Sequence, residues 1–127
     1  MKEQPVTGLK RLIAAFGFSK AGLRDIWQRE DAFRQEVILF FVAIPLALWL
    51  SSGVAQFGLL MGSILLMIIV EILNSAMEAI VDRIGPEIHE LSRIAKDLGS
   101  AAVLLTALFP LCIWGAVVLG RLGVITL

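Results

Sequence analysis

Three apolar stretches separated by polar segments dominate the pattern along the chain. They run over residues 37–50, 54–70 and 101–119, and only Gln56 interrupts the second. A helix needs about 20 apolar residues to cross the hydrocarbon core of a bilayer. The third stretch qualifies alone, whereas the first two must let polar residues enter the membrane at one end. The pattern predicts an all-α integral membrane protein with three transmembrane helices.

The residues before the first stretch follow a different pattern. Apolar side chains recur at the spacing of one helical face, at Leu9, Leu12, Ile13 and Phe16. Thr7 is a candidate N-cap, and Gly17 and Gly22 interrupt the pattern. We expect an amphipathic surface helix, or two, over about 7–30 on the inner leaflet. A helix packed against the spans is the alternative.

Basic residues are distributed unevenly around the predicted spans. Segment 51–53 has none, segment 82–97 has three, and Arg121 alone follows the third span. Seven precede residue 37, namely Lys2, Lys10, Arg11, Lys20, Arg24, Arg29 and Arg34. The positive-inside rule then predicts a cytoplasmic N-terminus and a periplasmic C-terminus. We expect a single domain over 1–127, with spanning helices over about 32–51, 54–82 and 98–121.

Composition supports the membrane assignment. The hydrophobic fraction is 58% and the charged fraction only 17%, whereas soluble domains carry about 25% charged residues. The formal net charge is zero, so nothing points to a nucleic-acid partner. The single cysteine, Cys112, lies within an apolar run, where we expect it to pack rather than react.

The second apolar stretch continues into a row of polar residues. Glu71, Asn74, Glu78 and Asp82 are spaced i, i+3, i+7 and i+11, which places them on one face of a helix. No glycine or proline lies between Glu71 and Gly85. A helix rises about 1.5 Å per residue, so we expect Glu71 just inside the cytoplasmic interface. Glu78 then lies about two turns closer to water.

Acidic residues at this depth are costly and usually functional. A carboxylate partly removed from water suits a general base for an alcohol, and further carboxylates can hold Mg²⁺ beside substrate phosphates. Lys96 follows as a candidate for binding phosphate. A structural ion pair between Glu71 and Arg34 is the alternative. The sequence has no Walker loop and no protein-kinase signature.

These residues resemble a known signature. Segment 71–83, EILNSAMEAIVDR, is similar to that of the prokaryotic integral-membrane diacylglycerol kinases, as are 32–36 and 95–103. The resemblance extends from about Gly8 to the end of the third span. Phe18, Lys20 and Arg93 depart from the best-known enterobacterial member, which has Tyr and Trp at the first two positions.

The resemblance implies a homotrimer in the bacterial inner membrane, with active sites shared between subunits. It implies MgATP-dependent phosphorylation of diacylglycerol to phosphatidic acid, with Glu71 as general base and Glu30 and Glu78 as metal ligands. The implied nucleotide contacts are Arg11, Phe18, Glu30, Glu78, Glu87, His89, Lys96 and Asp97. The implied lipid contacts are Arg11, Ser19, Arg34, Glu36, Glu71, Asn74 and Ser100.

Three alternatives remain open at this point. Undecaprenol kinases of the same family need the same base and metal, so the signature does not separate the two alcohols. A small multidrug transporter also uses a membrane glutamate, but it would favour four spans and an acid at mid-bilayer. The third alternative is a purely structural membrane subunit.

Overall fold

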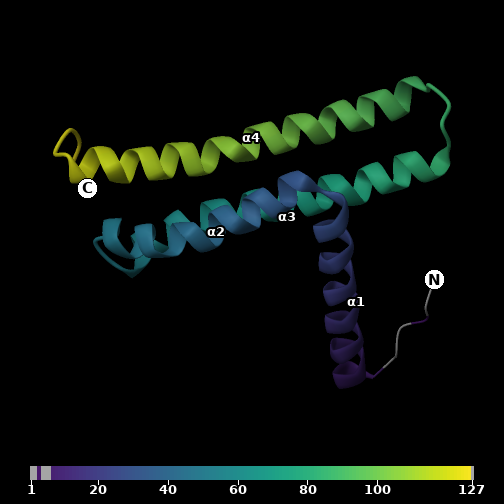
Figure 1. The fold of residues 1–127 in the computed structure, drawn as a ribbon, viewed down its shortest axis with the longest axis horizontal. Helices are drawn as coiled ribbons and strands as arrows, with labels where there is room; N and C mark the ends of the chain where they lie inside the picture. Colours follow the sequence, from purple (N-terminus) through teal and green to yellow (C-terminus); the bar gives the residue numbers. More distant parts are fainter. Residues whose placement is uncertain (1–2, 4–6, 127) are drawn as a thin grey trace. The chain divides into compact units, whose positions relative to one another are not determined.

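The computed structural model describes residue 3 and residues 7–126, and all the regular structure in this part of the chain is helical (Figure 1). Lys2 and Leu127, on which the predicted sidedness of the termini falls, lie outside the described residues. The chain divides into two units, residues 1–31 and residues 32–127. The prediction of an all-α protein is confirmed for the described residues.

The first unit contains α1 (Gly8–Arg29). Thr7 is at the N-cap position in an extended conformation, although its side chain makes no capping hydrogen bond. Gly17 and Gly22 do not break the helix, because a glycine costs only about 0.5–1 kcal/mol relative to alanine in a helix interior. The pattern interpreted as one helix or two is therefore a single helix, which ends where Glu30 becomes extended.

The second unit is built from α2 (Asp31–Leu50), α3 (Val54–Ile84) and α4 (Glu90–Arg121). Each contains one of the predicted apolar stretches, and each is long and apolar enough to cross a membrane. The expectation of three such helices is confirmed. Pro45 and Pro110 lie inside α2 and α4, and both helices continue through them, as transmembrane helices commonly do.

The α4 helix begins at Glu90, earlier than the expected start near residue 98. No glycine or proline interrupts residues 87–98, and His89 caps the helix by accepting a hydrogen bond from the Leu91 backbone N–H at 3.1 Å. The segment expected to be a connector is therefore mostly the first turns of α4. The true connection between α3 and α4 is the short segment 85–89.

The α3 helix runs antiparallel to both α2 and α4, and it packs along α4 (Figure 1). The Trp114 indole of α4 donates a hydrogen bond to the Leu60 carbonyl of α3 at 3.0 Å, and the Leu60 side chain is 0% exposed. Lipid tails are as apolar as the helix side chains, so the hydrophobic effect does not drive helices together inside a bilayer. Van der Waals packing and hydrogen bonds between helices stabilise their association instead. This contact helps to fix α4 against α3.

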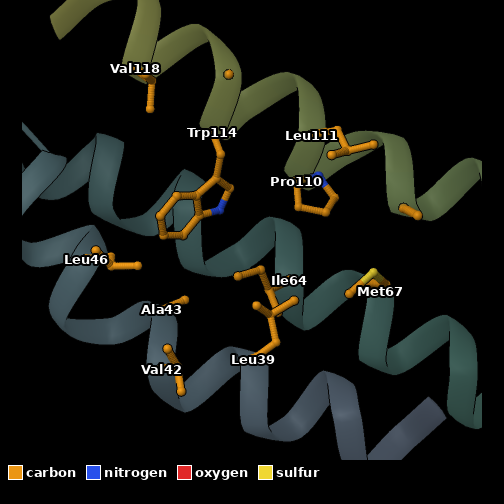
Figure 2. A pocket seen from close by; sticks show the side chains of 12 residues that line it. Leu39, Val42, Ala43, Leu46, Ile64, Met67, Pro110, Leu111, Trp114 and Val118 are labelled. Atoms are coloured by element: carbon orange, nitrogen blue, oxygen red, sulfur yellow. The ribbon is translucent and has the colours of Figure 1, made fainter.

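A cavity of about 660 Å³ lies between the three helices (Figure 2). Leu39 and Leu46 of α2, Met67 of α3, and Trp114 and Val118 of α4 contribute to its apolar walls. The Trp114 N–H already has a partner in the Leu60 carbonyl. The walls of this cavity are therefore apolar, whereas Asp82, Glu87, His89, Arg93 and Lys96 line a pocket at the α3–α4 connection.

Candidate active site

The α3 helix places Glu71 at the end of its apolar part. The Glu71 side chain is only 5% exposed, which is unusual for a carboxylate because an ionised group loses favourable hydration when it is buried. The same helix continues without a break to Ile84, so Asn74, Glu78 and Asp82 follow on one face, as the spacing predicts. This row links a buried carboxylate to the exposed end of the helix.

A second carboxylate approaches Glu71 from another helix. Glu36 of α2 is half-buried and close enough to Glu71 for the two charges to repel each other. Two neighbouring acids in a partly dry environment are costly to keep ionised together. Carboxylates partly removed from water are groups of the kind that serve as general bases.

The α3 and α4 helices approach each other closely beside Asn74. A Cβ atom added to Gly99 would lie 2.5 Å from Met77 Cε and 3.3 Å from Asn74 Cγ, and it would meet Asn74 Oδ1 more closely still. No side chain larger than hydrogen fits at position 99 unless Asn74 moves. The lack of a side chain at Gly99 therefore leaves room for the Asn74 amide against α4, a feature that the sequence analysis did not identify.

Asn74 in turn contacts the next acid along the helix. Its Nδ2 donates a long hydrogen bond to Glu78 Oε1 at 3.4 Å, and both residues are half-buried. A carboxylate oriented by an amide is a suitable magnesium ligand, because Mg²⁺ usually takes one or two protein carboxylates and completes its shell with water and phosphate oxygens. Among residues 3 and 7–126, no group of three or more His, Cys, Asp or Glu side chains gathers that could hold a metal ion.

Lys96 of α4 lies beside the same row and binds Asp82 of α3 at 2.8 Å. It precedes the apolar stretch 101–119, and both partners are exposed. The hydrogen bond to Asp82, the charge of Asp82 and the charge of Glu78 hold the pKa of the Lys96 ammonium above its usual value. A permanent positive charge is therefore fixed next to the acidic end of α3.

A polar pocket of about 280 Å³ lies where α3 turns into α4. Its lining brings together three of the predicted nucleotide contacts, Glu87, His89 and Lys96, with Asp82 and Arg93. His89 Nδ1 accepts the N–H of Leu91, so this side chain also has a structural function. The pocket combines acidic, basic and imidazole groups at the polar end of the bundle.

Asp97 lies just beyond this pocket on α4. Arg93 binds Asp97 at 2.7 Å and also pairs with Glu90, one turn before it, and all three side chains are exposed. The predicted nucleotide contact at Asp97 therefore has a cationic partner on its own helix. Arg93, whose role the sequence left open, organises the acids along this face of α4.

A comparison with known families decides the identity of this arrangement. The model of the family described as prokaryotic diacylglycerol kinase matches residues 17–118. The chain belongs to the prokaryotic diacylglycerol kinase family. The resemblance predicted from segment 71–83 is thereby confirmed.

Curated relatives agree with the family match. The diacylglycerol kinase of Escherichia coli (strain K12) is 51% identical over 108 residues, which cover 85% of this chain and 88% of the relative. The diacylglycerol kinase of Pseudomonas aeruginosa is 45% identical, and the match covers 90% of this chain and 93% of the relative. That of Haemophilus influenzae is 42% identical, and the match covers 87% of this chain and 94% of the relative. The likeness therefore extends over almost the whole of each protein.

Other predicted site residues of this family member lie elsewhere. Arg34 is half-buried in α2, and Ser100 is exposed in α4 next to Gly99. The first unit carries Arg11, Phe18, Ser19 and Glu30. The Ser19 hydroxyl donates to the Ala15 carbonyl of its own helix at 2.9 Å, and Glu30 is the residue between α1 and α2.

The candidate site of the second unit comprises Glu36, Glu71, Asn74, Glu78 and Lys96. Sequence spacing placed the α3 candidates on one face, but it missed the contact of Gly99 with Asn74 and the pairing of Asp82 with Lys96. The signal for Gly99 was weak, because a glycine near the start of an apolar run has many explanations. The signal for the ion pair was absent, because it depends on which faces of α3 and α4 meet.

Proposed function

We propose that this chain is an ATP-dependent diacylglycerol kinase, which transfers the γ-phosphate of ATP to the hydroxyl of a 1,2-diacylglycerol and forms phosphatidic acid and ADP. The observation that carries the proposal is the family match over residues 17–118, which includes the buried Glu71 and the row that follows it. The curated relatives named above are all diacylglycerol kinases, so they favour diacylglycerol over undecaprenol as the acceptor.

Glu71 acts as the general base in this proposal. A lipid hydroxyl reaches the site from the bilayer, and the burial of Glu71 on α3 keeps water away from its carboxylate. The base takes the hydroxyl proton as the oxygen attacks phosphorus. Glu36 interacts electrostatically with Glu71, and the Asn74 amide lies against α4 in the space that Gly99 leaves open. These two residues, with Arg34, Ser100 and Ser19, form the lipid side of the proposed site.

Glu78 and Glu30 are the proposed magnesium ligands. The hydrogen bond from Asn74 orients the Glu78 carboxylate, and Mg²⁺ bound there would neutralise charge on the phosphates of ATP. Glu30 lies in the extended residue between α1 and α2. Both are carboxylates, as Mg²⁺ prefers.

The nucleotide binds at the polar end of α3 and α4 in this account. The pocket that contains Glu87, His89 and Lys96 supports this assignment, because it places a permanent cation beside the acidic row. Lys96 and Asp97 are the proposed phosphate contacts of α4. Arg11 and Phe18 complete the proposed nucleotide contacts from α1.

The proposed assembly is a homotrimer in the bacterial inner membrane, with α1 on the cytoplasmic surface. Exposed apolar side chains on α1, which include Leu9, Leu12, Ile13 and Phe16, support a surface location. Many large apolar side chains of α2, α3 and α4 are also exposed in the single chain, as expected for helices that face lipid or other subunits. The mass of the protein in detergent, measured by light scattering with the detergent contribution subtracted, tests the trimer.

Transfer of labelled phosphate tests the activity. Purified protein in detergent is incubated with γ-labelled ATP, Mg²⁺ and either 1,2-diacylglycerol or undecaprenol. We expect label in phosphatidic acid and much less in undecaprenyl phosphate. Preferential labelling of undecaprenol would reassign the acceptor, and label in neither lipid would refute a lipid kinase.

A further inference from the structure

Three polar atoms around Glu71 are buried and have no hydrogen-bond partner within residues 3 and 7–126. They are Glu36 Oε2, Asn74 Oδ1 and Ser75 Oγ. Buried polar groups without partners are rare in folded proteins, because each loses its hydrogen bonds to water without replacement. Glu36 and Asn74 are proposed lipid contacts, whereas Ser75 is not among the residues that the family resemblance implies. Among these three atoms, its hydroxyl oxygen is the one that carries a hydrogen-bond donor when Glu36 is ionised.

Comparable hydroxyls elsewhere in the chain are bonded to their own helix. Ser63 Oγ donates to the Leu60 carbonyl at 2.8 Å, and Thr106 Oγ1 donates to the Ala102 carbonyl at 2.6 Å. Such bonds to a preceding carbonyl are the usual way for a helix to satisfy a buried serine or threonine. Ser75 is on the same helix as Ser63 but does not use this option. Its buried hydroxyl therefore keeps a hydrogen-bonding capacity that no group in residues 3 and 7–126 uses.

Ser75 is also placed between two residues of the proposed chemistry. It follows Glu71 by four residues and precedes Glu78 by three, so each of them is about one helical turn from Ser75 on the same face of α3. Asn74, whose amide lies closely against Gly99, is its neighbour in sequence. The hydroxyl thus lies between the proposed base and the proposed metal ligand, where the acceptor hydroxyl and the γ-phosphate must meet.

We propose that Ser75 is a further residue of the phosphoryl-transfer site, whose hydroxyl donates a hydrogen bond to a non-bridging oxygen of the transferred phosphoryl group. This inference rests on the proposed kinase function. The lipid hydroxyl oxygen forms a bond to the γ-phosphorus as the bond from that phosphorus to the bridging oxygen of ADP breaks. ADP leaves with the electron pair, the lipid hydroxyl proton passes to Glu71, and Ser75 keeps its own proton.

The chemistry of the three unpartnered atoms favours a phosphoryl oxygen as the partner of Ser75. Ionised non-bridging phosphoryl oxygens only accept hydrogen bonds, so an ionised Glu36 carboxylate and the carbonyl oxygen of Asn74 cannot bind them, whereas the Ser75 hydroxyl donates whatever the charge of its neighbours. A hydrogen bond to an ionised acceptor is roughly twice as strong as one between neutral groups. Such a donor strengthens as charge shifts during transfer and therefore contributes to kcat.

The test is Ser75→Ala, measured with ATP and with ATPγS. Alanine is the best helix former and removes only the hydroxyl. We expect kcat with ATP to fall by about ten- to a hundredfold, the range expected for a hydrogen bond to a charged group. The fall with ATPγS should be clearly smaller, because sulfur is a weak acceptor and the parent enzyme already lacks part of this bond.

Ser63→Ala is the matched control. It removes a buried hydroxyl from the same helix, one that is bonded to the Leu60 carbonyl, and it should leave the ratio of kcat with ATP to kcat with ATPγS unchanged. An equal loss in Ser75→Ala with both nucleotides, or no loss, would overturn the proposal.

A second comparison uses diacylglycerol and a dialkylglycerol, an ether analogue without ester carbonyls. A contact to the phosphoryl group predicts the same loss with both lipids in Ser75→Ala. A larger loss with the ester lipid would assign Ser75 to the acceptor and would also overturn the proposal. Failure of the parent protein to phosphorylate any lipid would instead refute the kinase function on which the proposal rests.

Discussion

Burial of an acid is the central feature at the scale of single residues. Glu71 is almost fully buried, and Glu36 on a neighbouring helix is close enough to interact with its charge. Glu78 is half-buried and Asp82 exposed, so burial decreases along the row. A base should be protected from water, whereas a magnesium ligand must be reached by a nucleotide that arrives from water. The gradient of burial along α3 matches this division of roles.

Removal of either proposed magnesium ligand should change the metal requirement. We expect Glu30→Gln and Glu78→Gln each to raise the Mg²⁺ concentration for half-maximal activity by at least about tenfold, because changes around a metal site commonly cost 10–100-fold in affinity. Glu90→Gln is the control, since Glu90 is an exposed acid that pairs with Arg93. Magnesium titrations of all three variants that match the parent would show that the ligands are assigned wrongly.

The sequence predicted the residues of α3 better than their surroundings. Glu71, Asn74 and Glu78 could be placed on one face because helical spacing depends only on local sequence. The close contact of Gly99 with Asn74 and the unpartnered hydroxyl of Ser75 depend on how α4 and α2 pack against that face. Spacing along one helix contains no information about a neighbour, so these two residues could not be predicted.

The contact between α3 and α4 is the feature of the site at the scale of helices. Gly99→Ala should lower both stability and kcat. Alanine would gain roughly 0.5–1 kcal/mol of helix propensity, but its Cβ would overlap the Asn74 amide and Met77 Cε. Overpacking of this kind costs typically about 1–3 kcal/mol, so the loss should prevail. Melting temperature in detergent and kcat on the same preparation measure both effects.

Gly115→Ala is the matched control for this prediction. Gly115 is on the same helix, and a Cβ there would have no atom within 4 Å. We expect an unchanged or slightly higher melting temperature and normal kcat. If Gly99→Ala behaves in the same way as Gly115→Ala, the close approach of the two helices at Asn74 is not required for activity.

Helix existence was predictable, but one helix boundary was not. Long apolar runs predicted α2, α3 and the spanning part of α4, because a bilayer requires about 20 apolar residues in a helix. The start of α4 at Glu90 was missed because residues 87–97 are polar and were interpreted as a connector. Capping by His89 and the pairing of Arg93 with Asp97 and Glu90 support the extra turns. Such local interactions are a weaker signal than hydropathy.

The orientation of the whole molecule in the membrane follows from the distribution of its basic residues. Most of the basic residues precede α2, and Arg121, which follows the apolar part of α4, stacks over Trp49 at 5.3 Å. The positive-inside rule therefore predicts a cytoplasmic N-terminus and a periplasmic C-terminus. Fusions of a reporter that is active only in the periplasm should be inactive at the N-terminus and active at the C-terminus. Equal activity of the two fusions would contradict three membrane crossings.

The complete site is the part of the whole molecule that the sequence could least predict. The resemblance assigns Arg11, Phe18, Ser19 and Glu30 to the same site as Glu71, although they precede the second unit. Sequence spacing cannot relate residues on separate helices, and a site shared between subunits would add contacts from another copy of the chain. The family signature supplied these residues, whereas the pattern of the chain alone did not.

The most direct test of this account is the turnover of Glu71→Gln, measured together with its melting temperature. Glutamine is nearly isosteric and polar, so the protein should fold, but it cannot accept the lipid hydroxyl proton. General-base catalysis is typically worth about 10²–10⁴ in rate. We predict that kcat for diacylglycerol falls at least about a hundredfold while MgATP binding and melting temperature are retained. If Glu71 instead forms a structural ion pair with Arg34, Glu71→Gln should lower the melting temperature and leave kcat near normal. A stable Glu71→Gln protein with normal kcat would show that Glu71 is not the general base.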